Sequence, residues 1–259
     1  MMAMNVVLAV TGKSLREFLR ERTVVLWTYA IPLFFLIVLP VMYGGVPADV
    51  VSSLKGGLTL TMVTFLVMTA GQSNLPGSIA TDGERGLYLK MASMPVSPWQ
   101  EGLGRILATT VTSILGAFLI LVSGYLYGAS FDGGLTEAFW AVGFSLLTVV
   151  ASAGVGLLIA AFVKGESAAT HTGVALTLIT YFLGGMALPY PQLPTVLQAF
   201  ARLHPVSSAN AAIVYLLAGE EFIGYNPLSA VQMASSIVST ALIFVVGMVS
   251  YSKLCWRRR

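Results

Sequence analysis

Charged side chains are scarce in this sequence. Asp, Glu, Lys and Arg make up 10% of the 259 residues and 56% are hydrophobic, whereas a typical soluble domain carries about 25% charged residues. The few charges stand in short clusters between long uncharged stretches. So little charge does not solvate a globular surface of this size. A soluble domain is therefore excluded, and we predict an all-α polytopic membrane protein with a single transmembrane domain over residues 1–259.

Residues that carry out chemistry are also few. Cys255 is the single cysteine, which excludes an internal disulfide. The sequence contains no HExxH, CxxC or GxSxG motif and no Walker-type phosphate-binding loop. We therefore expect no catalytic residues, no metal site and no cofactor bound by this chain, and we do not expect an enzyme.

Long apolar segments are the most prominent feature of the sequence. A membrane helix needs roughly 20 apolar residues to cross the hydrocarbon layer. We expect the first such segment to be retained and not cleaved as a signal peptide, because it follows a charged amphipathic stretch and lacks a small-residue cleavage site. Six segments are predicted to span: Val24–Tyr43, Leu58–Leu75, Ile106–Tyr127, Ala138–Val163, Ala168–Leu188 and Leu228–Tyr251.

The basic residues predict the orientation of these spans. Basic residues concentrate in cytoplasmic loops, whereas acidic residues contribute little to topology. Of the 14 Lys and Arg residues, only Lys55 and Arg202 fall in the loops of the other side. We expect a multi-pass protein of the plasma membrane with both termini in the cytoplasm. The net charge of +3 is then a topology signal, and no nucleic-acid partner is expected. His171 and His204 fall on opposite sides, so they cannot share a metal.

Three segments outside the predicted spans are expected to be structured. Residues 13–22, KSLREFLRER, form an amphipathic helix suited to the membrane interface, in contact with lipid. Residues 189–226 begin with three prolines, which end the fifth span, and continue with two apolar stretches too short to cross. This external segment is expected to form re-entrant or interfacial helices before the last span.

The third segment is the long cytoplasmic connection Thr81–Arg105. It mixes charges with Leu, Tyr and Met, and we expect a short helix from Glu84 to about Ser93 that ends before Pro95. Residues 81–98 are interpreted as a docking element for a cytoplasmic partner. The alternative is a loop folded back against the bilayer or against the protein's own helices.

Span two carries the most polar side chains. Thr61, Thr64 and Gln72 are candidates for lining a passage, and the alternative is that they face neighbouring helices. Ionisable residues at mid-span mark most ion paths, and the predicted spans contain none. This argues against a proton-coupled transporter.

These features resemble the membrane subunit, or permease, of type-2 ATP-binding-cassette exporters, a family of daunorubicin-type drug exporters and polysaccharide or lipid exporters. The resemblance covers nearly the whole chain. It is carried by KSLREFLRER before span one, by ERGLYLKMASMPVSP between spans two and three, by LPYPQLPTVLQAFARLHPVSSANA before the last span, and by six spans with both ends inside. The chain departs from the family at Val214, where many members carry an arginine.

The resemblance implies a division of labour between subunits. This chain would pair with a second copy or a similar permease, and each copy would dock a separate ABC ATP-binding subunit that holds ATP and Mg. Lys164 and Glu166 would make a secondary contact with that subunit. The main contact residues would be Glu84, Arg85, Leu87, Tyr88, Met91 and Met94.

The function expected from this resemblance is export of a drug-like, lipid or glycan substrate. An ATP-independent secondary transporter or channel is the main alternative, and it would need no partner ATPase. A membrane-embedded enzyme and a structural or assembly subunit are further alternatives.

Overall fold

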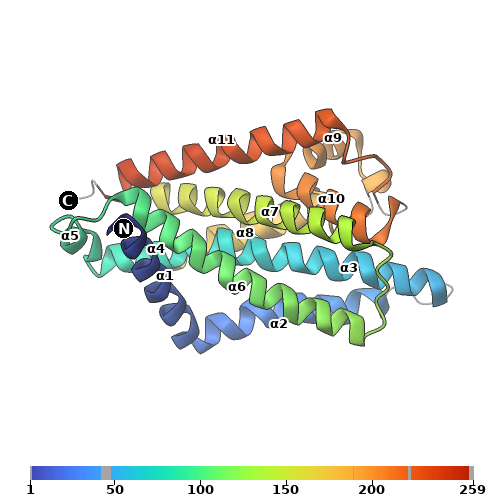
Figure 1. Cartoon of the computed structure of the whole chain (residues 1–259), viewed down its shortest axis with the longest axis horizontal. Coiled ribbons are helices and arrows are strands. Elements are labelled where there is room, and N and C mark those ends of the chain that lie inside the picture. Colours follow the sequence, from blue (N-terminus) through green and yellow to red (C-terminus); the bar gives the residue numbers. More distant parts are fainter. Residues whose placement is uncertain (1, 42–47, 189, 221–222, 257–259) are drawn as a thin grey trace.

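The computed structural model describes residues 2–41, 48–188, 190–220 and 223–256. Within these ranges the chain is helical and contains no strand. Figure 1 shows an elongated bundle in which α2, α3, α6, α7 and α11 follow the long axis. Both termini and the short helix α5 lie at one end, which we call the α5 end, and α9 and α10 lie at the other, the α9 end.

The helices follow one another with short connections. They are α1 (Met2–Arg20), α2 (Arg22–Val41), α3 (Ala48–Met68), the π-helix η1 (Thr69–Asn74), α4 (Leu75–Glu84), α5 (Leu87–Met91), α6 (Pro98–Leu126), α7 (Leu135–Phe162), α8 (Glu166–Leu183), the 3-10 helix η2 (Tyr190–Gln192), α9 (Thr195–Leu203), α10 (Pro205–Ala218) and α11 (Ala230–Leu254).

Five helical runs in the described ranges are long and apolar enough to cross a membrane. They are α2, the continuous run Val50–Glu84 through α3, η1 and α4, then α6, α7 and α11. The fifth predicted span, Ala168–Leu188, corresponds to α8, which has 18 residues and begins with the polar stretch ESAATHT. α8 is not among the five, so its crossing stays a prediction.

Two of the expected boundaries are wrong. The N-terminal helix begins at Met2, not Lys13, because residues 2–12 pack on α6: Thr11 Oγ1 donates to the carbonyl of Gly104 at 3.0 Å. The connection after span two is shorter than predicted, because α6 begins at Pro98 and not near Ile106. Ser97 caps α6, since its hydroxyl accepts from the N–H of Gln100 and the Gln100 side chain accepts from the N–H of Ser97.

The helix expected from Glu84 to Ser93 is divided. Glu84 ends α4, and α5 covers only Leu87–Met91. Gly86 between them has φ = +69°, a left-handed conformation that side-chain-bearing residues rarely adopt. The chain therefore turns at Gly86, and α5 is a separate five-residue helix.

The segment before the last span contains two short helices. α9 follows the prolines at 191 and 194, and α10 is apolar and has 14 residues, fewer than a membrane crossing needs. Whether α9 and α10 lie in the interface or re-enter the bilayer stays a prediction.

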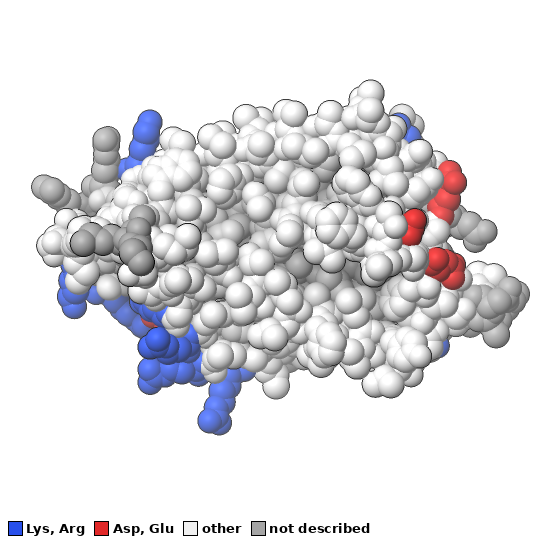
Figure 2. Space-filling view, viewed as in Figure 1, with Lys and Arg blue, Asp and Glu red and all other residues white. Residues whose placement is uncertain are grey.

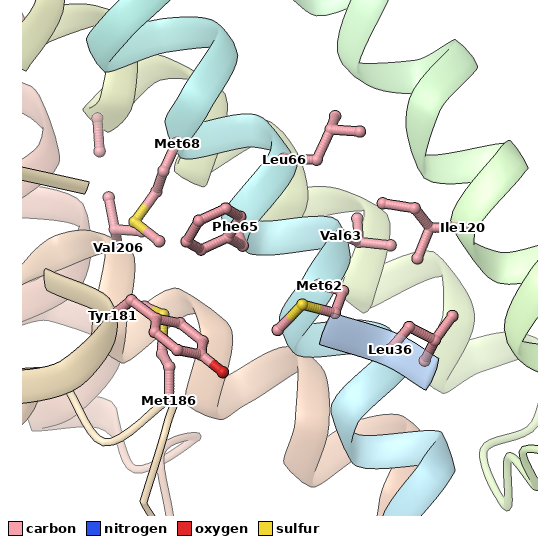
Figure 3. Packing of buried hydrophobic residues seen from close by; sticks show 11 residues of the cluster. Leu36, Met62, Val63, Phe65, Leu66, Met68, Ile120, Tyr181, Met186 and Val206 are labelled. Atoms are coloured by element: carbon pink, nitrogen blue, oxygen red, sulfur yellow. The ribbon is translucent and has the colours of Figure 1, made fainter. Parts of the chain in front are cut away.

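The core of the bundle lies where α2, α3, α6 and α8 meet. In Figure 3, Phe65 and Met68 of α3 face Tyr181 of α8, while Leu66 and Val63 face Ile120 of α6. The rings of Phe65 and Tyr181 pack edge to face with centroids 5.3 Å apart. This apolar middle separates two polar regions, one at each end of the molecule.

Candidate functional site

The short helix α5 presents two different faces. Tyr88 and Met91 are buried, with 7% and 8% of their surface exposed, whereas Leu89 and Met94 are 61% and 55% exposed. Glu84 and Arg85 are exposed as well, and Leu87 is half-buried. Of the six residues predicted to contact a partner, the structure therefore places Tyr88 and Met91 inside this chain. Leu89, which was not among the six, lies on the exposed face.

Tyr88 holds α5 against the last helix. Its ring packs against those of Tyr251 and Trp256, with centroid distances of 6.3 Å and 5.7 Å. The hydroxyl oxygens of Tyr88 and Tyr251 lie 3.4 Å apart. Burial raises the pKa of Tyr88 well above its ordinary value, so its hydroxyl stays protonated. α5 is thus anchored by a neutral aromatic contact.

A groove at the α5 end joins the two predicted contact segments. It has a volume of about 240 Å³ and is lined by Glu84 and Leu89 on one side and by Val163, Lys164 and Gly165 on the other. The backbone N–H of Glu166 donates to Glu84 Oε1 at 3.3 Å. A carboxylate at this position also faces the positive end of the α8 dipole. We call this feature the docking groove.

A cluster of charged side chains, most of them buried, joins α4 to α1 and α6. Asp82 of α4 accepts from Lys13 Nζ of α1 at 2.6 Å and forms an ion pair with Arg105 of α6. Arg105 also pairs with Glu101 one turn earlier, and the Tyr251 hydroxyl donates to Glu101. Glu101, Arg105 and Asp82 are 1%, 2% and 5% exposed. We call Lys13, Asp82, Glu101 and Arg105 the charge cluster.

A polar cavity opens beside the charge cluster. It has a volume of about 120 Å³ and lies between α1, α2, η1, α4, α6 and α8, with Asn74, Asp82 and Arg105 in its wall. Ligand sites for drug-sized molecules are typically 300 Å³ or more. The cavity is therefore sized for a few waters and does not hold a cargo molecule in this conformation.

The candidate passage residues lie inside the chain. Thr61, Thr64 and Gln72 are 5%, 1% and 1% exposed. Gln72 Oε1 is 3.4 Å from the Thr177 hydroxyl of α8. This arrangement is the alternative reading of the sequence, in which these side chains face neighbouring helices. Their role in lining a passage stays a prediction.

The α9 end carries a smaller polar arrangement. The guanidinium of Arg202 lies over the rings of Tyr190 and Tyr225, at 5.2 Å and 4.8 Å from their centroids. His204 caps α10 by accepting from the N–H of Ser207 at 3.4 Å. Burial lowers the pKa of His204 to about 4 and raises that of Tyr225 to about 12. Both side chains are neutral at pH 7.

Comparison with known protein families identifies the family of this chain. The model of the ABC-2 type transporter family matches residues 5–218. The chain belongs to the ABC-2 type transporter family. It is therefore a transport component of the membrane-permease type, which confirms the resemblance carried by KSLREFLRER and ERGLYLKMASMPVSP.

Two curated relatives carry drug-resistance names. The chain is 21% identical over 204 residues to a probable doxorubicin resistance ABC transporter permease protein, DrrC, of Mycobacterium tuberculosis, which covers 78% of this chain and 73% of that protein. It is 26% identical over 175 residues to the linearmycin resistance permease protein LnrN of Bacillus subtilis. That match covers 67% of this chain and 43% of LnrN.

The charge cluster of this ABC-2 family member was missed by the sequence reasoning. Asp82, Glu101 and Arg105 were interpreted as loop charges that face the cytoplasm. The structure corrects this, because Glu101 and Arg105 lie four residues apart on one face of α6 and are buried. The Ser-Pro-x-Gln cap at residues 97–100, followed by Glu and Arg at this spacing, was the signal that could have revealed them.

Proposed function

We propose that this chain is the membrane subunit of an ATP-driven exporter that works with a separate ATP-binding subunit. Two copies, or this chain and a similar permease, form the membrane half, and each copy docks one ATP-binding subunit at its α5 end. ATP and Mg are bound by that partner. In this proposal α8 completes six spans and both termini face the cytoplasm.

The convergence of two distant segments carries this proposal. Residues 84–94 and 164–166 are some 80 positions apart along the chain, and both line or flank the docking groove. Leu89 and Met94 give the surface an exposed apolar patch, and Glu84, Arg85 and Lys90 surround it with charge. An apolar centre with a charged rim is the composition of a protein-binding surface.

The distribution of charge supports the orientation. Figure 2 shows Lys and Arg gathered at the α5 end, and Asp and Glu on the visible face of the α9 end. Since basic residues mark the cytoplasmic side, the docking groove faces the cytoplasm, where a soluble ATPase operates. Closure of the ATP-binding subunits then pushes on α5, and packed helices transmit the motion as a rigid body.

The cargo we propose is a drug-like molecule. This choice rests on the relatives, which are named for doxorubicin and linearmycin resistance. Lipid and glycan cargoes are the alternatives within the family. Comparing ATP-dependent uptake of doxorubicin, of a labelled lipid and of a labelled glycan into inside-out vesicles separates the three cargoes, and equal uptake of each with and without this chain would reject all of them.

The first test asks whether the chain needs a partner ATPase. The tagged chain is purified from its native membrane in mild detergent, and bound proteins are identified together with ATPase activity. We expect an ATP-binding subunit in stoichiometric amount. Transport of the cargo by the purified chain alone, driven by an ion gradient, would instead support a secondary transporter.

A second test locates the contact. Leu89→Glu places a charge on the exposed face of α5, where it does not disturb the chain's own packing, and we expect loss of the ATP-binding subunit from the purified complex. Leu135→Glu is the matched control, since Leu135 is 91% exposed at the opposite end. Met91→Glu is not a clean test, because Met91 is buried. Normal copurification with Leu89→Glu would contradict the docking assignment.

A further inference from the structure

The charge cluster connects helices that are distant in the sequence. Through Lys13, Asp82 and Arg105 it joins α1, α4 and α6, and through Glu101 and Tyr251 it reaches α11. Tyr251 in turn contacts Tyr88 of α5. A continuous chain of polar contacts therefore runs from the docking helix to four other helices, α1, α4, α6 and α11.

Burial of these charges indicates a purpose other than stability. Desolvating ion pairs costs several kcal/mol per ion, and replacing a buried pair with apolar residues is often neutral or stabilising. The four side chains of the charge cluster are two cations and two carboxylates, and Lys13 also pairs with the partly exposed Glu17 of its own helix. Such a cluster instead fixes the relative positions of the helices that carry it, since each buried charge needs its partners in place.

Arg105 fixes that geometry at the centre. Its Nε donates to Glu101, its Nη2 to Asp82, and its Nη1 to the Ser78 hydroxyl at 3.1 Å. A planar guanidinium serves several acceptors at fixed angles, whereas a lysine is a single point charge on a flexible stem. Arg105 thus sets both the distance and the rotation of α4 relative to α6.

The docking helix needs such an attachment. α5 has five residues and is joined to α4 through Arg85 and Gly86 only. A helix this short is not stable alone, and a left-handed glycine turn does not fix its direction. Without the contact from Tyr88 to Tyr251, a push on α5 would bend the turn at Gly86 before it reached the bundle.

We propose that Arg105, with Asp82, Glu101 and Tyr251, is a positioning group that fastens α5 to the adjacent ends of α1, α6 and α11, so that these ends move with α5 as one body. This proposal rests on the proposed function, because it concerns the step in which a docked ATPase drives the membrane subunit. The groups act through α5 and contact neither ATP nor cargo.

The test compares two distances in the complex with its ATP-binding subunit, reconstituted in proteoliposomes. One distance joins probes on Ala92→Cys, an exposed position directly after α5, and Lys253→Cys, both at the α5 end. The other joins Ala92→Cys and Leu135→Cys at opposite ends. Both pairs are made in a Cys255→Ser background, with labelled copies diluted by unlabelled ones. Pulsed electron spin resonance is recorded without nucleotide and after trapping with ATP and vanadate.

We expect the first distance to stay constant on trapping while the second changes. In Arg105→Lys the first distance should broaden and shift, and maximal ATP turnover of the complex should fall at least about tenfold while KM for ATP stays constant. Tyr251→Phe keeps the ring and removes only the hydroxyl, so it repeats the test if Arg105→Lys does not fold. Arg20→Gln, a change of an exposed cation outside the cluster, is the control.

The outcomes separate this proposal from the function on which it rests. If the first distance changes in the unsubstituted protein as much as the second, the single-body inference is wrong while the docking function stands. An unchanged distance and turnover in both Arg105→Lys and Tyr251→Phe would also overturn it. If no ATP-binding subunit copurifies and neither distance responds to ATP, the proposed function itself fails.

Discussion

The two ends of the molecule accommodate their polar side chains by different interactions. At the α5 end, five charged side chains are joined in ion pairs, and three of them, Asp82, Glu101 and Arg105, are buried. At the α9 end, the polar side chains are neutral or exposed: His204 caps a helix and Arg202 lies over two tyrosines. Charge in ion pairs fixes angles between helices, whereas caps and aromatic contacts tolerate small displacements. We infer that the α5 end transmits force and the α9 end closes the bundle.

The strongest test of this comparison removes one charge from the cluster. Asp82→Asn removes the carboxylate that Lys13 and Arg105 share, and we expect a loss of about 3–5 kcal/mol in stability. The double variant Lys13→Gln/Asp82→Asn also removes one of these two cations, and it leaves the buried pair of Arg105 and Glu101 in place, while Glu17 stays partly exposed to solvent. It should recover much of the loss in thermal unfolding measured in detergent. Equal stability of the single and double variants would show that charge balance does not govern this end.

The next effect concerns the middle of the bundle, between the two ends. A Cβ atom on Gly173 of α8 would lie 1.9 Å from the carbonyl oxygen of Gln72 in η1, so Gly173→Ala should cost about 1–3 kcal/mol. Gly143→Ala is the matched control, since nothing lies within 4 Å of its added Cβ. Because alanine is favoured over glycine in a helix interior, Gly143→Ala should raise the free energy of unfolding by about 0.5–1 kcal/mol. Similar melting temperatures for the two variants would argue against close packing of α8 on η1.

A smaller effect is expected at the α9 end. Arg202→Gln removes the cation from above Tyr190 and Tyr225, and we expect a loss of about 1 kcal/mol, because exposed contacts of this kind are weak. Arg202→Lys should retain part of that energy. Hydrogen exchange of residues 190–203 reports the change locally. A loss as large as that of Asp82→Asn would remove the distinction between the two ends.

The smallest effect is a dependence on pH at the same end. The pKa of His204 is lowered to about 4 in the folded chain, against about 6.5 when unfolded. The unfolded state therefore binds the proton more readily, so the stabilisation is complete above pH 6.5 and is lost as the pH falls towards 4. Between pH 7.5 and 6 we expect the free energy of unfolding to fall by less than about 1 kcal/mol through His204. His204→Asn keeps a capping acceptor and should remove this part of the slope in the melting temperature.

Several features could be predicted from the sequence because they depend on local composition. The scarcity of charge excluded a soluble fold, the apolar stretches marked five helices that the structure also has, and the basic residues separated the two ends. A short helix with a docking role was predicted from Leu, Tyr and Met among charges near Pro95; the structure has the helix α5 there, and its docking role stays a prediction. The inner and outer faces of this helix were not separated, because Tyr88 is buried against Ile106 of α6 and Tyr251 of α11, which lie elsewhere in the sequence.

The sequence by itself determined that this chain is helical with segments apolar enough to cross a membrane, since hydrophobicity acts locally along the chain, and its motifs carried the resemblance to the permease family. Only the tertiary structure decided where its buried charges lie and what they connect. Lys13, Asp82 and Arg105 come from three distant segments, and no pattern in any one of them specifies the ion pairs. An ion pair depends on the distance between its atoms, and that distance is set by how the helices pack.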